Sequence, residues 1–233
     1  MIMDKRAFTL IELLVVIAIL GIIASVVFVF LADRREEARI AAGKQFDSSL
    51  RTGLGFWAQG IWHFDEGAGS PTVADASGNN NTGTINGAIW QTEDTCGLEF
   101  GTCLDFDGSD DYVDVGADSS LGLQYPMSIS AWINMDQLAS TKGNLMSIVG
   151  RDHGTPDRQF EFRIGMDDRL HLTVYPFGST GGQEAISAST VFTSSDIGRW
   201  IFVAITVDEA RNGKLYRDGK EIGVARAVIL SKP

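Results

Sequence analysis

The chain has 233 residues, a formal net charge of −11 and a sequence pI of about 4.6. An acidic surface of this kind argues against nucleic-acid binding, because such binding requires clustered Lys and Arg side chains to neutralise the phosphates. The acidity serves solubility, and it can also supply carboxylates to a bound calcium ion.

The N-terminal segment is the most informative part of the sequence. A short basic leader with Lys5 and Arg6 precedes an apolar segment, residues 8–31, in which Glu12 is the one ionisable side chain. An α-helix of this length would extend about 36 Å, which exceeds the hydrocarbon core of about 30 Å. A carboxylate at mid-bilayer costs about 2.5–3.5 kcal/mol on insertion scales, so Glu12 requires a partner. A new α-amino group, created by cleavage just before Phe8, would provide it.

The run from Lys5 to Leu14 resembles the class III signal of type IV prepilins and pseudopilins. The resemblance implies that a prepilin peptidase cuts after Ala7 and methylates Phe8, and that Glu12 pairs with the terminus of a neighbouring subunit during assembly. It also implies a single-pass protein of the cytoplasmic membrane, with a cytoplasmic leader and an exported C-terminal part. Ala7 stands where the family usually has Gly. An ordinary single-span anchor is the alternative, but it gives no reason for Glu12.

Residues 32–57 continue the helical pattern. Charged side chains of opposite sign at i,i+3 and i,i+4 spacing begin it. Apolar residues then recur every four residues, which predicts a stripe that packs on another surface. The helix is expected to end at Gly53 and Gly55. The members of the stripe are Ala38, Ala42, Phe46, Leu50 and Leu54.

From residue 60 onward the pattern is that of short strands and turns. Apolar and polar residues alternate over Ser128–Ile133, Phe160–Ile164 and Trp200–Ile205, and clusters of Gly, Asn, Asp and Ser separate such runs. The sequence therefore predicts an α+β chain, with a long N-terminal hydrophobic helix followed by an antiparallel β-sandwich. The expected divisions are a leader (1–7), a transmembrane or filament-core helix (8–31), an amphipathic stem helix (32–57) and a head domain (58–233).

The head sequence is similar to the laminin-G-like, concanavalin A-like jelly-roll module over nearly all of residues 60–225. The resemblance implies a jelly-roll head. Modules of this family usually continue into further strands, so we expect a C-terminally truncated domain; alternatively, the strand around Ile61–Phe64 lacks its usual neighbour. The segments that carry the similarity follow one another in family order: Gly60–Gly67, Asp75–Gly83, Leu104–Val113, Ser130–Ile133, Trp200–Ile205 and Leu215–Gly219.

Two cysteines, Cys96 and Cys103, lie in the part of the chain that is expected to be exported. An oxidising compartment favours a local disulfide between them, worth about 2–3 kcal/mol for so short a loop. The alternative is a pair of unreacted thiols. Without further Cys or His ligands, the pair is poor evidence for zinc.

No catalytic constellation stands out, so we expect a protein that is not an enzyme. His63, His153 and His171 are scattered and match no catalytic motif. Jelly-roll glycoside hydrolases need spaced carboxylates, whereas the candidate strand Phe160–Ile164 holds Glu161 alone.

Calcium is the one cofactor that the polar loops suggest. It takes roughly six to eight oxygens, often from Gly-bearing loops, and modules of the resembling family commonly bind it at a loop rim. The alternative is that these residues simply form the turns. One candidate loop holds Asp75, Asn79 and Asn81, and another holds Asp107, Asp110 and Asp111.

Aromatic side chains are the other candidates for a binding surface. We expect Trp132 and Trp200, which alternate within apolar strands, to lie in the core. Trp57 and Trp62 flank the junction with the stem and are expected to pack there, and Trp90 is a candidate by residue type.

Together these features predict the structural subunit of a type IV pilus or pilus-like filament that displays the head, for adhesion to a glycan or surface-protein ligand. Its expected partners are prepilin peptidase, other pilin subunits and the cytoplasmic membrane before assembly, and no nucleic acid. Two alternatives stay open. One is a pseudopilin of a type II secretion-like system with a periplasmic filament, and the other is a membrane-anchored lectin-like protein that does not polymerise.

Overall fold

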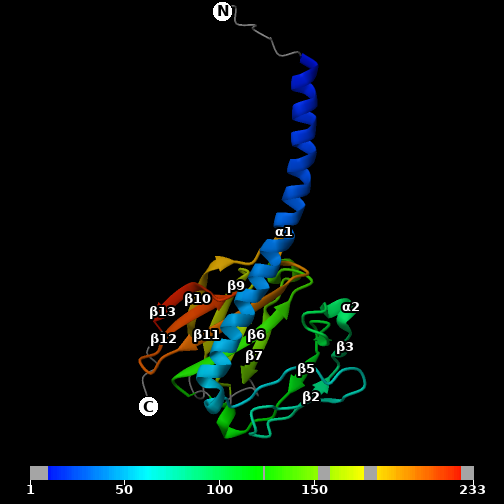
Figure 1. The fold of residues 1–233 in the computed structure, drawn as a ribbon. Helices are drawn as coiled ribbons and strands as arrows, with labels where there is room; N and C mark the ends of the chain where they lie inside the picture. Colours follow the sequence, from blue (N-terminus) through cyan, green and yellow to red (C-terminus); the bar gives the residue numbers. More distant parts are fainter. Residues whose placement is uncertain (1–9, 123, 152–157, 176–182, 227–233) are drawn as a thin grey trace, which may run out of the picture. The chain divides into compact units, whose positions relative to one another are not determined.

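The computed structural model describes residues 10–122, 124–151, 158–175 and 183–226. A single long helix, α1 (Leu10–Leu54), is followed by a region of short antiparallel strands (Figure 1). This arrangement confirms the predicted α+β class. The helix passes into a 3₁₀ turn, η1 (Gly55–Trp57), so the two glycines mark its end as predicted.

The first part of α1 is long and apolar enough to cross a membrane. The segment Leu10–Phe28 has a mean hydropathy of 3.0, and none of these described side chains is buried. Its leucines, isoleucines and valines cover the whole circumference of the helix, which is typical of a segment that meets an apolar environment on every side. A helix satisfies its own backbone hydrogen bonds, as a membrane requires.

The chain forms two compact units that divide α1 after Ala42. The described residues of the first unit belong to the helix alone. The second unit begins at Gly43 and contains the last turns of α1 together with all the strands.

Two four-stranded sheets and two smaller sheets make up the strand region, and all named strand pairs are antiparallel. One larger sheet has the order β10-β9-β8-β7 and the other β13-β12-β11-β6; the smaller sheets have the orders β1-β2-β5 and β3-β4. The strands of the larger sheets are β6 (Met127–Asn134), β7 (Met146–Arg151), β8 (Phe160–Ile164), β9 (Arg169–Val174), β10 (Gln183–Val191), β11 (Trp200–Val207), β12 (Asn212–Arg217) and β13 (Lys220–Arg226).

The strands of the smaller sheets precede β6 in the sequence, and the short helices lie in the connections between strands. Their short lengths follow from the many Gly, Asn and Asp residues, which favour turns. These elements are β1 (Thr72–Val73), β2 (Gly83–Asn86), β3 (Ile89–Gln91), α2 (Glu93–Cys96), β4 (Cys103–Asp105), β5 (Tyr112–Asp114), η2 (Ser119–Leu121), α3 (Ala139–Lys142) and η3 (Ser194–Asp196).

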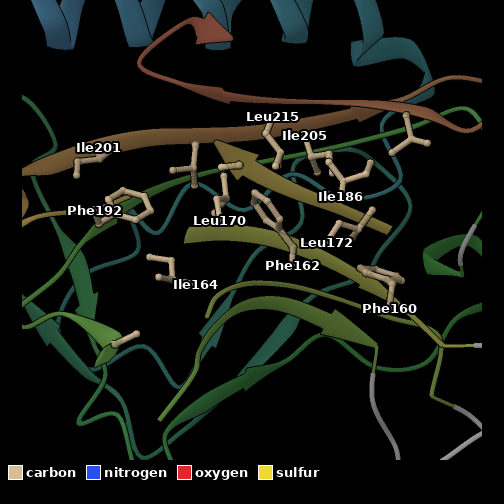
Figure 2. Close-up of a cluster of buried hydrophobic side chains, with 14 of the residues drawn as sticks. Phe160, Phe162, Ile164, Leu170, Leu172, Ile186, Phe192, Ile201, Ile205 and Leu215 are labelled. Carbon is tan, nitrogen blue, oxygen red and sulfur yellow. The ribbon is translucent and has the colours of Figure 1, made fainter. Parts of the chain in front are cut away.

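The main hydrophobic core lies between the two larger sheets. Phe162 of β8 and Leu170 of β9 meet Ile205 of β11 and Leu215 of β12 in one cluster, and all four side chains are fully buried (Figure 2). Alternate residues of each strand supply this core, as the period of two requires. Burying a side chain of this size stabilises the fold by about 1.5–3 kcal/mol. The core therefore confirms the predicted sandwich.

A second apolar cluster covers the opposite face of the β13-β12-β11-β6 sheet. Strand β11 is buried on both faces, because Ile201, Val203 and Ile205 enter the main core while Phe202 and Ala204 point the other way. Aromatic rings gather around Phe202 on that face. We call this cluster the aromatic layer; its members are Phe46, Phe100, Trp132, Trp200, Phe202 and Tyr216.

The expected positions of three tryptophans need correction. Trp132 and Trp200 are half-buried in the aromatic layer and not in the core between the sheets, because strand alternation does not tell which of two covered faces a residue joins. Trp57 does not pack at the end of the helix and is 73% exposed. Trp62 is half-buried, and its indole N–H donates to the carbonyl of Asn81 at 2.8 Å.

Candidate functional site

The processing and assembly residues lie at the N-terminal end of the chain. Ala7 and Phe8 fall outside the described residues, so their predicted roles stay predictions. Glu12 lies in the first turn of α1, where a negative charge interacts favourably with the positive end of the helix dipole. Around Glu12, the described side chains of Leu10, Ile11, Leu13 and Leu14 are exposed.

The last turns of α1 pack on the aromatic layer. Phe46 lies 5.9 Å from Phe202 and 4.9 Å from Tyr216 between ring centroids. Gly43 allows this close approach, because a Cβ at that position would come within 2.7 Å of the Trp132 ring. Of the stripe predicted from the sequence, Phe46 packs here and Leu50 is half-buried. The prediction is wrong for Ala38 and Ala42, which are exposed, and for Leu54, which is 43% exposed.

A disulfide loop forms part of the same packing. Cys96 and Cys103 are joined by a disulfide, which confirms that prediction. Between them, Phe100 stacks on Trp200 at 4.6 Å and meets Trp132 at 5.0 Å. The indole N–H of Trp200 donates to the carbonyl of Cys96 at 2.6 Å. The loop is thus held on the sheet at two points, by the hydrogen bond at Cys96 and by the ring of Phe100.

Lys44 links the helix to this loop in a way that the sequence does not reveal. Its ammonium forms an ion pair with Glu99 and lies 5.3 Å from the centroid of the Phe100 ring. The partners are 55 and 56 residues away in the chain, and no local spacing rule connects them. Both groups are partly exposed, so the ion pair contributes little to stability, about 0–1 kcal/mol.

Three acidic side chains gather in the loop before β5. Asp107, Asp110 and Asp111 place one carboxylate oxygen each within 4.8 Å of one another. The loop holds this shape through backbone amides: Asp111 accepts from Asp107 N at 2.8 Å, and Asp107 accepts from Ser109 N at 2.7 Å. Of the three, Asp111 is half-buried and the other two are exposed.

The donor set of this acidic cluster fits a hard cation. Carboxylate oxygens are the ligands that Ca²⁺ and Mg²⁺ prefer, and softer metals would require nitrogen or sulfur. Lys142 also lies beside the cluster, because its ammonium donates to the carbonyl of Gly108. A lysine there partly compensates the acidic charge, and sequence reasoning missed it because Lys142 and Gly108 are 34 residues apart.

The other predicted calcium loop has its polar groups committed to the fold. Asp75 accepts hydrogen bonds from the backbone amides of Ile61, Ser77 and Asn81 and from the Ser77 hydroxyl. Partial burial opposes its ionisation, but these hydrogen bonds outweigh burial and hold the pKa of Asp75 below its ordinary value. In the described part of the chain, the acidic group with metal-binding spacing does not include Asp75.

The two asparagines of that loop fix it to the segment that follows α1. Asn79 donates from its amide to the carbonyl of Ala58 at 2.8 Å, and Asn81 donates to the carbonyl of Gln59 at 2.7 Å. Asn81 is only 5% exposed. These contacts show that Asp75, Asn79 and Asn81 hold the shape of the loop, and calcium binding by these residues stays a prediction.

Glu161, the single acid of the strand Phe160–Ile164, contacts a tyrosine and an arginine. Its carboxylate accepts from the Tyr175 hydroxyl at 3.3 Å and lies 3.6 Å from an Arg163 nitrogen. Burial raises the pKa of Tyr175, and the neighbouring carboxylate of Glu161 adds to this rise. On the next strand, His171 lies 2.7 Å from Asp167. These polar contacts lie on the face of the sheet that points away from the core.

The comparisons with protein families match both parts of the chain. Residues 107–232 match the concanavalin A-like lectin/glucanases superfamily, and residues 2–28 match the prokaryotic N-terminal methylation motif. Because the first match covers more than half of the chain, the protein belongs to the concanavalin A-like lectin/glucanases superfamily. It carries in addition the type IV prepilin motif at its N-terminus, as the residues around Glu12 predicted.

The motif and the apolar helix together indicate membrane anchoring followed by export. The same motif implies processing by a prepilin peptidase and assembly with other pilins. Among solved structures, the chain is similar to residues 221–444 of an S-layer domain-containing protein from Clostridium thermocellum ATCC 27405. The two are 24% identical, with a TM-score of 0.44, over 74% of this chain and 75% of that one. No curated protein matches.

Proposed function

We propose that this protein is a structural subunit of a type IV pilus or pilus-like filament and that its head mediates adhesion. The observation that supports this most is the apolar segment Leu10–Phe28 of α1, which overlaps the methylation motif and has every described side chain exposed. An exposed apolar helix is stable only in a membrane or against other apolar helices. A subunit that moves from membrane to filament uses both environments in turn.

In this proposal each N-terminal residue has a defined role. The leader, residues 1–7, is cytoplasmic and is removed after Ala7, and Phe8 becomes the methylated terminus. Glu12 then pairs with the terminal amine of a neighbouring subunit. In an apolar surrounding, a charge without its partner is strongly unfavourable, so the pairing sets the axial register of the subunits. Residues 8–31 form the filament core, residues 32–57 the stem and residues 58–233 the head.

The test is the mass of the N-terminal peptide after co-expression of the full chain with a prepilin peptidase. We expect a chain that begins at N-methylated Phe8. A chain that still begins at Met1, while the peptidase processes a control prepilin, would contradict the pilin pathway and favour the membrane-anchored lectin-like protein. Ala7→Gly gives the residue usual in this family and should be processed at least as well.

A pseudopilin is the second candidate, because the methylation motif is shared by both kinds of filament. Electron microscopy of cells that express the processed chain separates the two. Long surface fibres that contain this subunit support a pilus. A short periplasmic filament, together with loss of protein secretion when the chain is deleted, supports a pseudopilin of a type II secretion-like system.

We propose a binding role for the head, with no catalytic role. The concanavalin A-like superfamily includes lectins as well as glucanases, and pilins as a rule are not enzymes. The proposed ligand is a glycan or a surface protein. Retention of cells or purified filaments on immobilised glycans, compared with a variant that lacks residues 58–233, tests this role.

We further propose that Asp107, Asp110 and Asp111 hold a Ca²⁺ ion, which would stiffen the loop before β5. Isothermal titration with CaCl₂ tests it, with Asp111→Asn expected to weaken binding at least tenfold because a formal charge is lost from a small donor set. Lys142→Gln should tighten binding by removing a competing charge. Unchanged heats in both variants would show that calcium binds elsewhere or not at all.

A further inference from the structure

One surface loop carries the acceptor sequence for N-linked glycosylation. Asn80-Asn81-Thr82 matches the pattern Asn-x-Ser/Thr with a residue other than proline in the middle, and the pattern occurs once in the sequence. Oligosaccharyltransferases attach glycans at this pattern in surface loops of exported proteins. The pattern is short, so its meaning depends on how the fold presents it.

The structure distinguishes Asn80 from the two asparagines beside it. Asn79 and Asn81 direct their amide groups to the backbone of Ala58 and Gln59, and both hold the loop in place. Asn80 and Thr82, the two residues that a transferase must recognise, are exposed. Asn80 has a φ of 62°, a left-handed conformation that asparagine tolerates at the tip of a turn. The fold thus presents the acceptor pair on a fixed loop.

We infer that Asn80 is a site of N-linked glycosylation. In the reaction, the amide nitrogen of Asn80 forms a bond to the anomeric carbon of a lipid-diphosphate-linked oligosaccharide. The bond between that carbon and the diphosphate oxygen breaks, the lipid diphosphate leaves with the electron pair, and the amide proton passes to a base of the transferase. In the cell the inference rests on the export that the proposed function requires.

Two exposed aromatic rings adjoin the segment to which this loop is hydrogen-bonded. Phe56 is 92% exposed and Trp57 is 73% exposed, and their ring centroids are 5.5 Å apart. Trp57 is bonded to Ala58, whose carbonyl accepts the hydrogen bond from the neighbour of Asn80. Aromatic faces of this kind offer apolar area against which the C–H face of a sugar ring can pack. The segment that anchors the Asn80 loop therefore also carries exposed apolar surface of the kind that sugar rings pack on.

The experiment uses the purified full chain in detergent. The chain is incubated with an oligosaccharyltransferase that accepts plain Asn-x-Thr acceptors and with a lipid-linked oligosaccharide, and the peptide that contains Asn80 is analysed by mass spectrometry. We expect the glycan mass on Asn80 in the wild type. Asn80→Gln and Thr82→Ala should abolish it, whereas Thr82→Ser, which keeps the hydroxyl, should retain it. Asn86→Gln, outside the pattern, serves as the matched control.

A synthetic peptide of residues 77–84 shows whether the transferase reads this sequence at all. If the enzyme modifies the peptide and leaves the folded chain unmodified, the loop does not present Asn80 and the inference is overturned. It is also overturned if the peptide itself is refused while a reference acceptor is modified. Because the assay does not depend on export, failure here counts against Asn80 and leaves the filament proposal untouched.

Discussion

The two ends of α1 show how one helix can meet two different environments. Leu10–Phe28 is apolar on every side, and none of its described side chains is buried. Gly43–Leu54 has a single apolar stripe, and Phe46 at its start packs on rings of β11 and β12. The apolar side chains of the first end thus stay exposed in the described structure, whereas the second end packs on its own head domain. The fraction of the helix circumference that is apolar therefore distinguishes the two parts. A helix that is apolar on all sides suits a membrane or other helices, and a helix with one apolar stripe suits packing on a single surface.

The largest expected effect concerns the apolar end. We expect Glu12→Ala to abolish filament assembly while membrane insertion and export continue, because the neighbour's terminal amine then lacks its partner. Electron microscopy and a membrane-fractionation assay measure the two effects. Ser25→Ala, a small change in the same helix at a hydroxyl that donates to the carbonyl of Ile22, should assemble normally. Normal filaments from Glu12→Ala would remove the proposed role of this carboxylate.

At the packed end, Phe46→Ala should lower the free energy of unfolding of the head by about 3 kcal/mol. This value is at the low end of the range for such substitutions, because the Phe46 ring is half-buried. Denaturant unfolding of the full chain in detergent provides the measurement. Leu54→Ala, at an exposed position of the same stripe, should cost less than about 1 kcal/mol. Equal losses from the two variants would mean that Phe46 does not seat the helix.

Alanine substitutions at two glycines of the packed end should change the stability of the protein in opposite directions. Gly43→Ala should destabilise the head by about 1–3 kcal/mol, because the new methyl group would meet the Trp132 ring at 2.7 Å. Gly53→Ala meets nothing within 4 Å, so it should stabilise the helix by about 0.5–1 kcal/mol through helix propensity. Thermal unfolding of both variants tests the prediction. Two stabilising effects would show that the helix does not approach the aromatic layer so closely.

A buried ion pair beside the main core should contribute about 2 kcal/mol, since Arg217 lies over the ring of Phe192, a residue of that core. Asp196 is 4% exposed and pairs with Arg217, the neighbour of Tyr216 on β12. Burial opposes its ionisation, but hydrogen bonds from Thr193 and Arg217 and the charge of Arg217 outweigh burial and lower the pKa of Asp196. We expect Asp196→Asn to unfold at lower denaturant than the wild type at neutral pH.

The pH dependence of that difference follows from the lowered pKa. The stabilisation by Asp196 is fully present above the ordinary pKa of 3.8 and is lost as the pH falls through the lower value of the folded state. The stability difference between the wild type and Asp196→Asn should therefore shrink only in acid. A difference that stays constant from neutral pH into strong acid would show that the charge of Asp196 contributes nothing.

Much of the fold could be predicted from the sequence because its signals are local. The spacing of apolar residues predicted the helix and the strands of the sandwich. The resemblance of short motifs to those of a known family predicted the superfamily. The short spacing of Cys96 and Cys103 indicated their disulfide, which the structure contains. Features of this kind depend on neighbours within a few residues, which the sequence displays directly.

The features that escaped prediction depend on contacts between distant parts of the chain. Alternation placed Trp132 and Trp200 on an apolar face but could not tell the core from the aromatic layer. Lys44 with Glu99, and Lys142 with Gly108, meet only through the tertiary fold. The acidic cluster was visible as sequence, whereas the compensating lysine beside it was not. Surface aromatics such as Trp57 follow no periodic rule at all.

The way α1 is seated has a mechanical consequence. In a filament of such subunits, a pull on the head would load the contact of Phe46 with the rings of Phe202 and Tyr216, because α1 joins the head to the rest of the subunit. Phe100 and the disulfide loop hold Trp132 and Trp200 in position behind that contact. A reducing agent that opens the loop should therefore lower the rupture force of the head under pulling before it lowers the thermal stability of the main core.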